Sequence, residues 1–301
     1  MSPGEFLTSL EGTDAGLRLA VVLAVAAAFL HALFGALQKG RHDPWVTRGA
    51  IDICYGVLAL PVALFLVPWP EPHMWPILAG VFVIHALYKY FQAMTYQRGA
   101  YTVVYPVVRG TGPLFTVLGG WLVFGEVFNA AQWAGVAVLL AGIYGLALYN
   151  LRNVSAGRKT LVPALWLAVV TGFFVALYTT YDAFGIRSTA DPFTFIAWFF
   201  LIDSVFMPVF VRHRLAALQW SELWPLFRRG LLGAVIAVAS FGSIMLATRL
   251  GPVGQAAVLR ETSIVFAALI GWAMLGESVG PRRLALMGLI ATGAVIVQLA
   301  A

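Results

Sequence analysis

The sequence contains few charged residues. Asp, Glu, Lys and Arg together make up 11% of the 301 residues, compared with about 25% in soluble globular proteins. Hydrophobic residues account for 61% of the chain, and the mean hydropathy is +0.87. Because so few polar side chains cannot cover a surface that faces water, the composition excludes a soluble protein. It indicates a chain that lies in a lipid bilayer.

Cysteine and the common enzyme motifs are also scarce. The only cysteine is Cys54, which excludes a disulfide within the chain and a paired-thiol metal site. The sequence lacks a His-Glu-x-x-His motif, a Gly-x-Ser-x-Gly motif, an Asp-rich metal cluster and a Gly-x-x-x-x-Gly-Lys phosphate loop. We therefore expect a protein that is not an enzyme, has no metal or cofactor, and draws any energy from gradients or from another protein.

Apolar runs separated by Pro, Gly and polar residues predict ten helices, each close to the roughly 20 residues that cross a bilayer. The first five are expected over residues 18–38, 45–67, 74–97, 100–124 and 129–149. The second five are expected over residues 161–184, 192–211, 229–249, 252–275 and 282–300. A short polar tail (1–17) precedes them, and a linker (151–160) separates the two sets. The predicted fold class is an all-α polytopic membrane protein.

The two sets of five helices resemble each other. Sliding the chain along itself by 151 residues places Arg109-Gly-Thr on Arg260-Glu-Thr, and Gly125-Glu126 on Gly276-Glu277. The same shift places Asp52 on Asp203. Because each half (18–150 and 161–301) holds an odd number of helices, the second half enters the membrane from the opposite side. This predicts two inverted five-helix repeats, an arrangement typical of transporters that alternate between inward-open and outward-open states.

Basic residues are distributed unevenly between the predicted loops. The net charge is +6, but the basic side chains are scattered through short loops and form no contiguous patch for nucleic acid. Three of these basic residues fall on the face that holds both termini and thirteen on the other face. By the positive-inside rule, the thirteen-residue face is cytoplasmic and both termini are predicted on the periplasmic side.

Three stretches carry a resemblance to a known family. They are His31-Ala-Leu-Phe-Gly-Ala-Leu-Gln-Lys39, Tyr105-Pro-Val-Val-Arg-Gly-Thr-Gly-Pro113 and Leu259-Arg-Glu-Thr-Ser263. With these stretches, and with Gly-Glu ending helices 4 and 9, the chain resembles the EamA family of the drug/metabolite transporter superfamily, and within it the YddG-like exporters.

The resemblance implies a ten-helix carrier of the inner membrane that exports small polar metabolites, with amino acids as the first candidates. Lipophilic cations or drugs, phosphorylated metabolites and a non-transporting membrane partner remain alternatives. The expected partners are a small-molecule substrate, the lipid bilayer and, if transport is coupled, protons. The protein is expected as a monomer or a homodimer.

Ionisable residues fall inside the predicted spans, where an unpaired charge costs about 2.5 to 3.5 kcal/mol. Asp52 and Arg109 lie at similar depths, as do Asp203 and Arg260, so we expect two salt bridges that either lock each repeat or contact substrate. Other candidates have no like residue at the equivalent position of the other repeat. Lys89, Asp182 and Glu261 are therefore candidates for binding a charged substrate or a proton, and His31 and His85 either couple proton movement or pack.

Aromatic residues lie near the same depth. Tyr88, Tyr101, Tyr105, Tyr178, Tyr181 and Trp198 either pack or line a substrate cavity, where their rings and hydroxyl groups would suit an amino acid. Pro106 and Pro113 predict a kink beside Arg109 in helix 4. Helix 9 lacks the second proline, so we expect the two repeats to differ in flexibility. Gly135, Gly142, Gly288 and Gly293 permit either close packing of helices 5 and 10 or dimer contacts.

Overall fold

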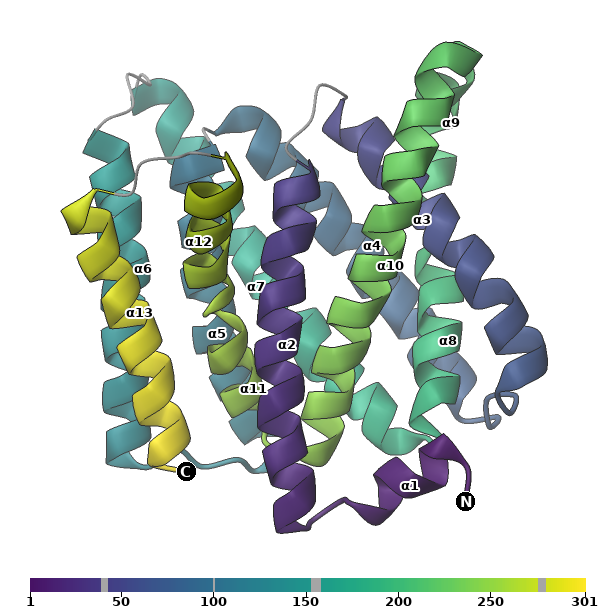
Figure 1. Cartoon of the computed structure of the whole chain (residues 1–301), viewed down its shortest axis with the longest axis horizontal. Coiled ribbons are helices and arrows are strands. Elements are labelled where there is room, and N and C mark those ends of the chain that lie inside the picture. The colour runs from purple at the N-terminus through teal and green to yellow at the C-terminus, as the bar shows by residue number, and fades with distance from the viewer. Residues whose placement is uncertain (39–42, 100, 153–157, 276–279) are drawn as a thin grey trace. The chain divides into compact units, whose positions relative to one another are not determined.

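The computed structural model describes residues 1–38, 43–99, 101–152, 158–275 and 280–301. Within these residues the chain is helical (Figure 1). The elements are α1 (Pro3–Ser9), α2 (Asp14–Gln38), α3 (Pro44–Pro61), η1 (Val62–Leu66), α4 (Met74–Arg98), α5 (Tyr101–Phe124), α6 (Ala130–Arg152), α7 (Arg158–Ser188), α8 (Pro192–Asp203), α9 (Phe206–Ala216), α10 (Trp220–Leu250), α11 (Val253–Arg260), α12 (Ser263–Leu275) and α13 (Pro281–Leu299). They form ten segments long and apolar enough to cross a membrane, which confirms the predicted fold class.

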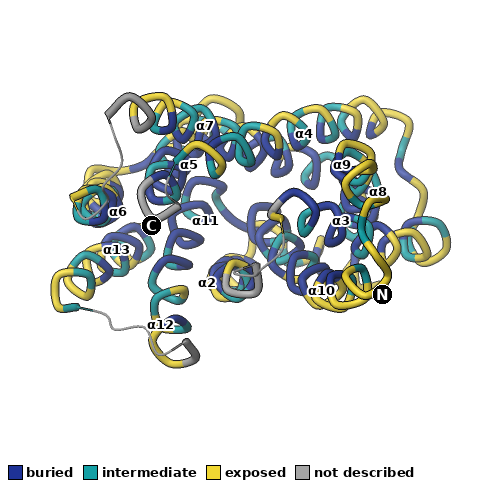
Figure 2. The backbone as a smooth tube through the Cα atoms, turned by 90° about the horizontal axis from the view of Figure 1, so that it is seen from above, coloured by how far each residue is buried: buried dark blue, intermediate teal, exposed yellow. Residues whose placement is uncertain are grey.

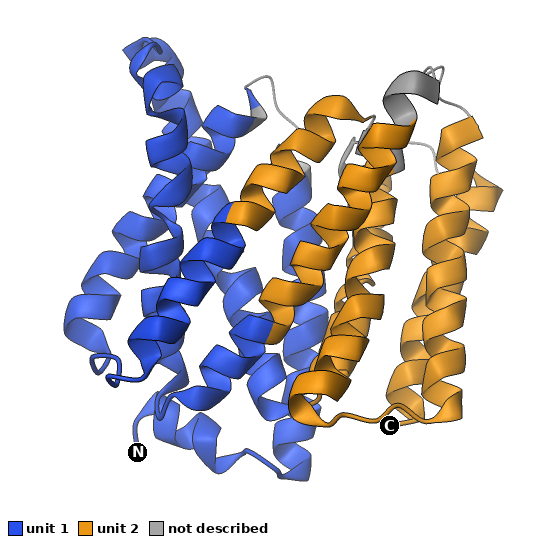
Figure 3. Cartoon of the chain, turned by 180° about the vertical axis from the view of Figure 1, so that it is seen from behind, with its two compact units in different colours: residues 1–86, 181–251 blue, residues 87–180, 252–301 orange. Residues whose placement is uncertain are grey.

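The helices form two compact units that do not coincide with the sequence repeats (Figure 3). Unit 1 comprises Met1–Ala86 and Tyr181–Gly251, and unit 2 comprises Leu87–Thr180 and Pro252–Ala301. Equivalent helices of the two repeats pack against each other inside a unit. Helix α3 packs on α8 and α9 in unit 1, while in unit 2 α5 packs on α11 and α6 on α13. Each unit therefore combines helices from both halves of the sequence.

Aspartate followed by proline begins two of these helices in unit 1. The Asp43 carboxylate accepts a hydrogen bond from the Trp45 backbone N–H at 2.9 Å, and Asp191 accepts one from Phe193 at 2.8 Å. The carboxylate satisfies a backbone donor that has no partner in the first turn, and proline at the first helical position loses no hydrogen bond. These local signals fix where α3 and α8 start.

The predicted polar tail is partly helical. A capping box between Ser2 and Glu5 starts α1, and α2 begins at Asp14, four residues earlier than predicted. The Arg249 guanidinium holds this segment in unit 1, because it pairs with Glu11 and donates to the carbonyl groups of Ile186 and Thr189 at the end of α7. Apolar periodicity alone does not predict α1, because this helix is short and is stabilised by contacts with residues distant in sequence.

Small residues bring α6 and α13 together in unit 2. A Cβ atom added to Gly293 would lie 2.5 Å from the Leu139 backbone N, and one added to Gly135 would lie 2.8 Å from the Gly293 carbonyl oxygen. Gly142 is equally close to the Leu286 carbonyl, whereas Gly288 has open space. Close helix packing is thus confirmed for three of the four predicted glycines. Exposed positions alternate with buried ones along both helices (Figure 2), as expected where one side packs and the other faces lipid.

Two membrane-crossing helices of the second repeat are interrupted. Helix 7 breaks between α8 and α9, directly after Asp203, and helix 9 breaks between α11 and α12, directly after Arg260. By contrast, α5 stays helical through Pro106 and Pro113. The kink predicted for helix 4 stays a prediction, whereas its counterpart, helix 9, is interrupted. In α5 the hydroxyl groups of Thr111 and Thr116 donate to the backbone carbonyl groups of Val107 and Gly112, one turn earlier.

Candidate functional site

Eight of the nine ionisable residues predicted inside the spans are buried. None is more than 5% exposed, so they do not face lipid, as the cost of an isolated charge in a bilayer requires. These residues are Asp52, His85, Lys89, Arg109, Asp182, Asp203, Arg260 and Glu261. His31 differs, because it is half-buried on α2. Six of the eight buried residues belong to two clusters, one in each unit.

The first cluster, which we call the His85 cluster, consists of His85, Asp182, Asp203 and Tyr55 in unit 1. The His85 Nε2 atom lies 3.0 Å and 3.2 Å from the two Asp182 carboxylate oxygens. Its Nδ1 atom lies 3.9 Å from Asp203 Oδ1. The Tyr55 hydroxyl donates to Asp203 Oδ2 at 2.5 Å, and the Phe199 ring packs edge-on against the imidazole. Four helices, α3, α4, α7 and α8, therefore meet at one histidine.

Asp52 lies in the same unit and has a local partner. Its Oδ1 atom accepts a hydrogen bond from Arg48 Nε at 2.8 Å, one turn earlier on α3. Residues four apart lie on one face of a helix, which makes this pairing possible within α3. Within the units, Asp52 pairs with Arg48 and Arg109 with Glu261; the predicted Asp52–Arg109 salt bridge joins residues of different units and stays a prediction. Arg48 falls inside the predicted helix 45–67, but similarity of depth between helices did not identify it as a partner.

The second cluster, which we call the Arg109 cluster, consists of Arg109, Arg260, Glu261, Ser263 and Tyr178 in unit 2. The Arg109 Nε atom lies 2.9 Å from Glu261 Oε2. The same guanidinium donates to the Ser263 hydroxyl at 2.8 Å and to the Arg260 carbonyl oxygen at 3.3 Å. Arg260 donates to the Tyr178 hydroxyl at 3.3 Å. Asp203 and Arg260, the second predicted pair, thus belong to different clusters.

The Arg109 cluster lies at the break in helix 9. Glu261 and Thr262 form the turn between α11 and α12 and are bonded to residues three positions earlier. Arg109 on the intact helix α5 contacts the residues on either side of this turn. Under the 151-residue shift Glu261 corresponds to Gly110 and Ser263 to Gly112. This polar site therefore has no copy at the equivalent positions of helix 4.

The predicted aromatic residues divide between the units. In unit 2, Tyr88 and Tyr178 have ring centroids 4.8 Å apart, and the Tyr105 ring lies 6.0 Å from the Arg109 guanidinium. In unit 1, half-buried Tyr181 lies against Phe184. The side chain of Tyr101 is outside the described residues, and Lys89 is buried on α4 four residues after His85. The tyrosines of the Arg109 cluster thus supply hydroxyl groups beside buried charges.

Trp198 lies in a different environment from the tyrosines. Its ring packs between Trp69 and Trp75, with both centroid distances 5.1 Å, and its buried indole nitrogen has no hydrogen-bond partner. Trp69 and Trp75 are exposed, which suits the anchoring of a membrane interface. A contact between Trp198 and substrate stays a prediction.

Sequence reasoning missed several polar residues of the site. Tyr55 and Arg48 flank Asp52 at three and four residues on α3, so helical spacing was the available signal. Glu126, in the Gly-Glu motif after helix 4, accepts hydrogen bonds from the Val253 and Gly254 backbone N–H groups at 2.7 Å and 3.0 Å and caps α11. Gly125 permits this turn with its φ of +68°. The second motif, Gly276-Glu277, lies outside the described residues.

No group of three or more His, Cys, Asp or Glu side chains that could hold a metal ion is found in the part of the chain that the structure describes. The clusters consist instead of hydrogen-bond donors, acceptors and charges inside membrane-crossing helices. Such groups can bind a polar solute or carry protons.

Comparison with known proteins identifies the family. The model of the EamA-like transporter family matches residues 18–148 and again residues 162–299. The chain belongs to this family. As a member of this family, the chain is a multi-pass membrane transporter.

The curated relatives match only parts of the chain. A riboflavin transporter of Vibrio cholerae is 31% identical over 130 residues, which are 42% of this chain and 43% of that protein. The uncharacterized membrane protein YvdS of Bacillus subtilis is 37% identical over 70 residues, or 23% of this chain and 62% of that protein. The matches thus span less than two thirds of either relative.

A solved crystal structure resembles the chain over almost its whole length. It superposes with a TM-score of 0.77, covers 94% of this chain and 99% of its own, and is 18% identical in sequence. This likeness establishes the fold and leaves the substrate to be inferred from the site.

Proposed function

We propose that the protein is a secondary transporter that exports small polar metabolites, first among them amino acids, by alternating access. One observation carries the proposal. Helices 7 and 9 are interrupted inside the membrane directly beside buried charged residues, Asp203 and Arg260. Discontinuous helices of transporters expose backbone groups and charges to bound substrate at such points, and irregular backbone is stable in a membrane only where protein or water satisfies it.

The chemistry of the clusters supports an amino acid. A carboxylate needs cationic donors, and the Arg109 cluster has two guanidinium groups and a tyrosine hydroxyl. Among small polar metabolites, amino acids carry such a carboxylate.

Riboflavin is a second candidate substrate. The similarity to a riboflavin transporter of Vibrio cholerae supports it, and so do the tyrosine rings beside Arg109, because aromatic side chains stack on planar ligands. A partner protein that does not transport is the remaining alternative.

Orientation and location are part of the proposal. We infer an inner-membrane protein with both termini on the periplasmic side, because the predicted loops on the opposite face carry thirteen of the sixteen basic residues counted between them. Export then runs from the face that is rich in arginine to the face that holds the termini. The proposed working form is a monomer or a homodimer.

Counterflow in proteoliposomes tests the proposal. Vesicles loaded with unlabelled solute are given radiolabelled amino acids or riboflavin, with and without an inward proton gradient. We expect accumulation of at least one label, and its loss in Arg260→Gln but not in Arg228→Gln, since Arg260 is buried in the cluster and Arg228 is exposed on α10. If wild-type protein accumulates none of these labels, export of amino acids or riboflavin is wrong.

A further inference from the structure

Arg109 and Glu261 form an ion pair that is close but poorly aligned. Arg109 Nε lies 2.9 Å from Glu261 Oε2, which is the length of a charge-assisted hydrogen bond. Both atoms are buried and have no hydrogen-bond partner, so the N–H group is not directed at the oxygen. A carboxylate that fits arginine accepts two parallel hydrogen bonds from the guanidinium. Glu261 therefore balances the Arg109 charge but leaves a buried donor and a buried acceptor unsatisfied.

The other acceptors of Arg109 are neutral. Its Nη2 atom donates to the Ser263 hydroxyl and to the Arg260 carbonyl oxygen. Among the residues that the structure describes, Glu261 is the one carboxylate within ion-pair distance of this guanidinium. A buried donor left unsatisfied is costly, and hydrogen bonds to ionised acceptors are the strongest that a guanidinium makes. A second carboxylate that aligns with the Arg109 nitrogens can therefore compete with Glu261.

The two partners differ in how firmly the backbone holds them. Arg109 lies within α5, which is helical from Tyr101 to Phe124. Glu261 lies in the turn between α11 and α12, where the N–H groups of Glu261 and Thr262 bond to carbonyl groups three positions earlier. Residues at the ends of helices absorb the dihedral changes of hinge motions. Glu261 is therefore the partner that can withdraw while Arg109 stays in place.

The equivalent position of the first repeat has little room for an acidic side chain. Under the 151-residue shift Glu261 corresponds to Gly110 on α5. A Cβ atom added to Gly110 would lie 3.0 Å from the Tyr144 ring and 3.2 Å from the Ile143 side chain, both on α6. At this pair of positions the acidic residue therefore comes from the second repeat alone.

We propose that Glu261 occupies the place of the substrate carboxylate on Arg109, and that the carboxylate of a transported amino acid displaces it. The proposal rests on the proposed transport function and names the residue with which substrate competes. Arg109 keeps one carboxylate throughout, because the substrate arrives as Glu261 withdraws at the turn. The return of Glu261 then expels the substrate, which keeps the site from holding it too tightly for release.

Thermal unfolding in detergent, with sodium acetate as the free carboxylate, tests this exchange. Sodium chloride at equal ionic strength and neutral acetamide are the reference solutes. We expect acetate to restore roughly half or more of the melting temperature that Glu261→Gln loses, because binding to the folded state stabilises it. If Glu261 covers Arg109 for about nine-tenths of the time, the half-saturating acetate concentration should be about tenfold lower in Glu261→Gln than in wild type. Glu5→Gln, which alters an exposed glutamate of α1, should respond as wild type does. The double variant Arg109→Gln with Glu261→Gln should not respond.

The outcomes separate the exchange from the transport function. The exchange is overturned if acetate stabilises Glu261→Gln no more than chloride does, if wild type and Glu261→Gln respond at the same concentration, or if acetate never stabilises wild type. If Glu261→Gln does not fold, Glu261→Asp replaces it, because its shorter side chain draws the carboxylate away from Arg109; a response equal to that of wild type then overturns the exchange. If wild-type protein accumulates no label in counterflow, the proposed function fails, while the acetate response still decides whether a free carboxylate replaces Glu261 on Arg109.

Discussion

Neutralising Glu261 should destabilise the protein strongly. The Glu261 and Arg109 side chains are buried, and Arg109 Nε lies 2.9 Å from Glu261 Oε2. Glu261→Gln leaves the Arg109 charge with only the Ser263 hydroxyl and the Arg260 carbonyl as described acceptors. Removing one partner of a buried ion pair costs about 3 to 5 kcal/mol. At about 2 °C or more per kcal/mol for a chain of this size, the melting temperature should fall by roughly 6 °C or more.

Thermal unfolding in detergent, followed by tryptophan fluorescence, measures this effect. Glu5→Gln, an exposed glutamate in the first turn of α1, is the control for loss of a negative charge. The double variant Arg109→Gln with Glu261→Gln should recover most of the loss, because neither member of this pair is then left charged without its partner. A melting temperature of Glu261→Gln equal to that of wild type would refute the argument that this pair neutralises a charge inside the membrane.

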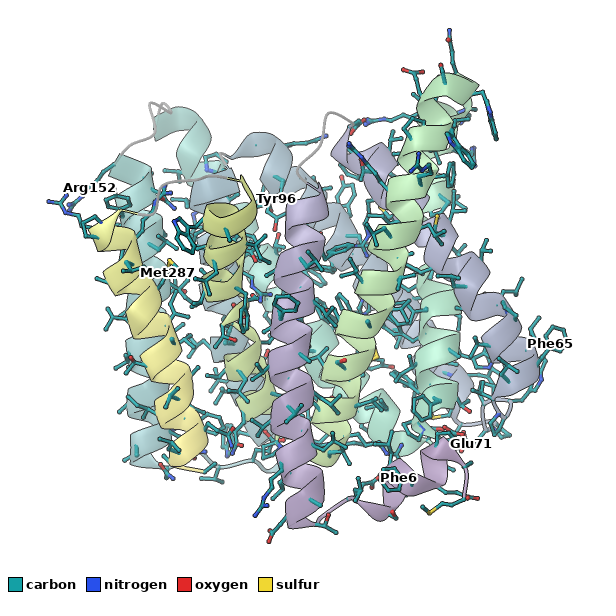
Figure 4. All side chains as sticks on the ribbon, in the orientation of Figure 1. Phe6, Phe65, Glu71, Tyr96, Arg152 and Met287 are labelled. Carbon is teal, nitrogen blue, oxygen red and sulfur yellow. The ribbon has the colours of Figure 1, made fainter. Side chains whose placement is uncertain are left out.

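Two further predictions concern other parts of the fold. Gly293→Val should lower the free energy of unfolding by about 1 to 3 kcal/mol, because its Cβ would lie 2.5 Å from the Leu139 backbone N. Gly288→Val on the same helix is the control, since a side chain there has open space. Equal melting temperatures for the two variants would contradict the close packing of α6 and α13. Glu71 lies near the first turn of α8 (Figure 4), and although its burial opposes ionisation, hydrogen bonds from the Ala190 N–H and the Thr189 hydroxyl lower its pKa from 4.5. The stabilisation that the ionised Glu71 side chain gives the fold should therefore be complete above pH 4.5 and be lost as the pH falls through the lowered pKa. The melting temperatures of wild type and Glu71→Gln should converge at acid pH. A difference that does not change with pH would refute the role of these hydrogen bonds.

Periodicity and composition were sufficient to predict the ten spans, because a membrane requires long apolar helices. They also located the buried ionisable residues, since a charge inside such a span must be sheltered. The ion-pair partners of these residues are harder to predict. Equal depth suggested Asp52 for Arg109, but within its unit Arg109 pairs with Glu261, which has no counterpart in the first repeat. Depth along a helix constrains one coordinate only, whereas pairing also depends on how helices rotate and where they break.

Prolines do not mark the breaks. Pro113 removes one backbone donor from α5, yet the helix continues through it. Helix 9 has no proline at its break; Glu261 and Thr262 form the turn, and the Arg260 carbonyl before it accepts a hydrogen bond from Arg109. A charged partner on the neighbouring helix can therefore stabilise an open turn that the local sequence does not specify.

The differences between the repeats explain how a duplicated scaffold can hold polar clusters that are not themselves duplicated. Helices 4 and 9 pack against each other in unit 2, and the intact one supplies the arginine that stabilises the interrupted one. Helices 2 and 7 share unit 1 in the same way, and Tyr55 on intact α3 donates to Asp203 at the break in helix 7. In both pairs the first repeat provides a continuous helix with a donor, and the second provides an opening. A substitution that restored continuity in helix 7 or helix 9 would therefore remove backbone groups from the site without changing the predicted spans, so it should impair transport more than insertion into the membrane.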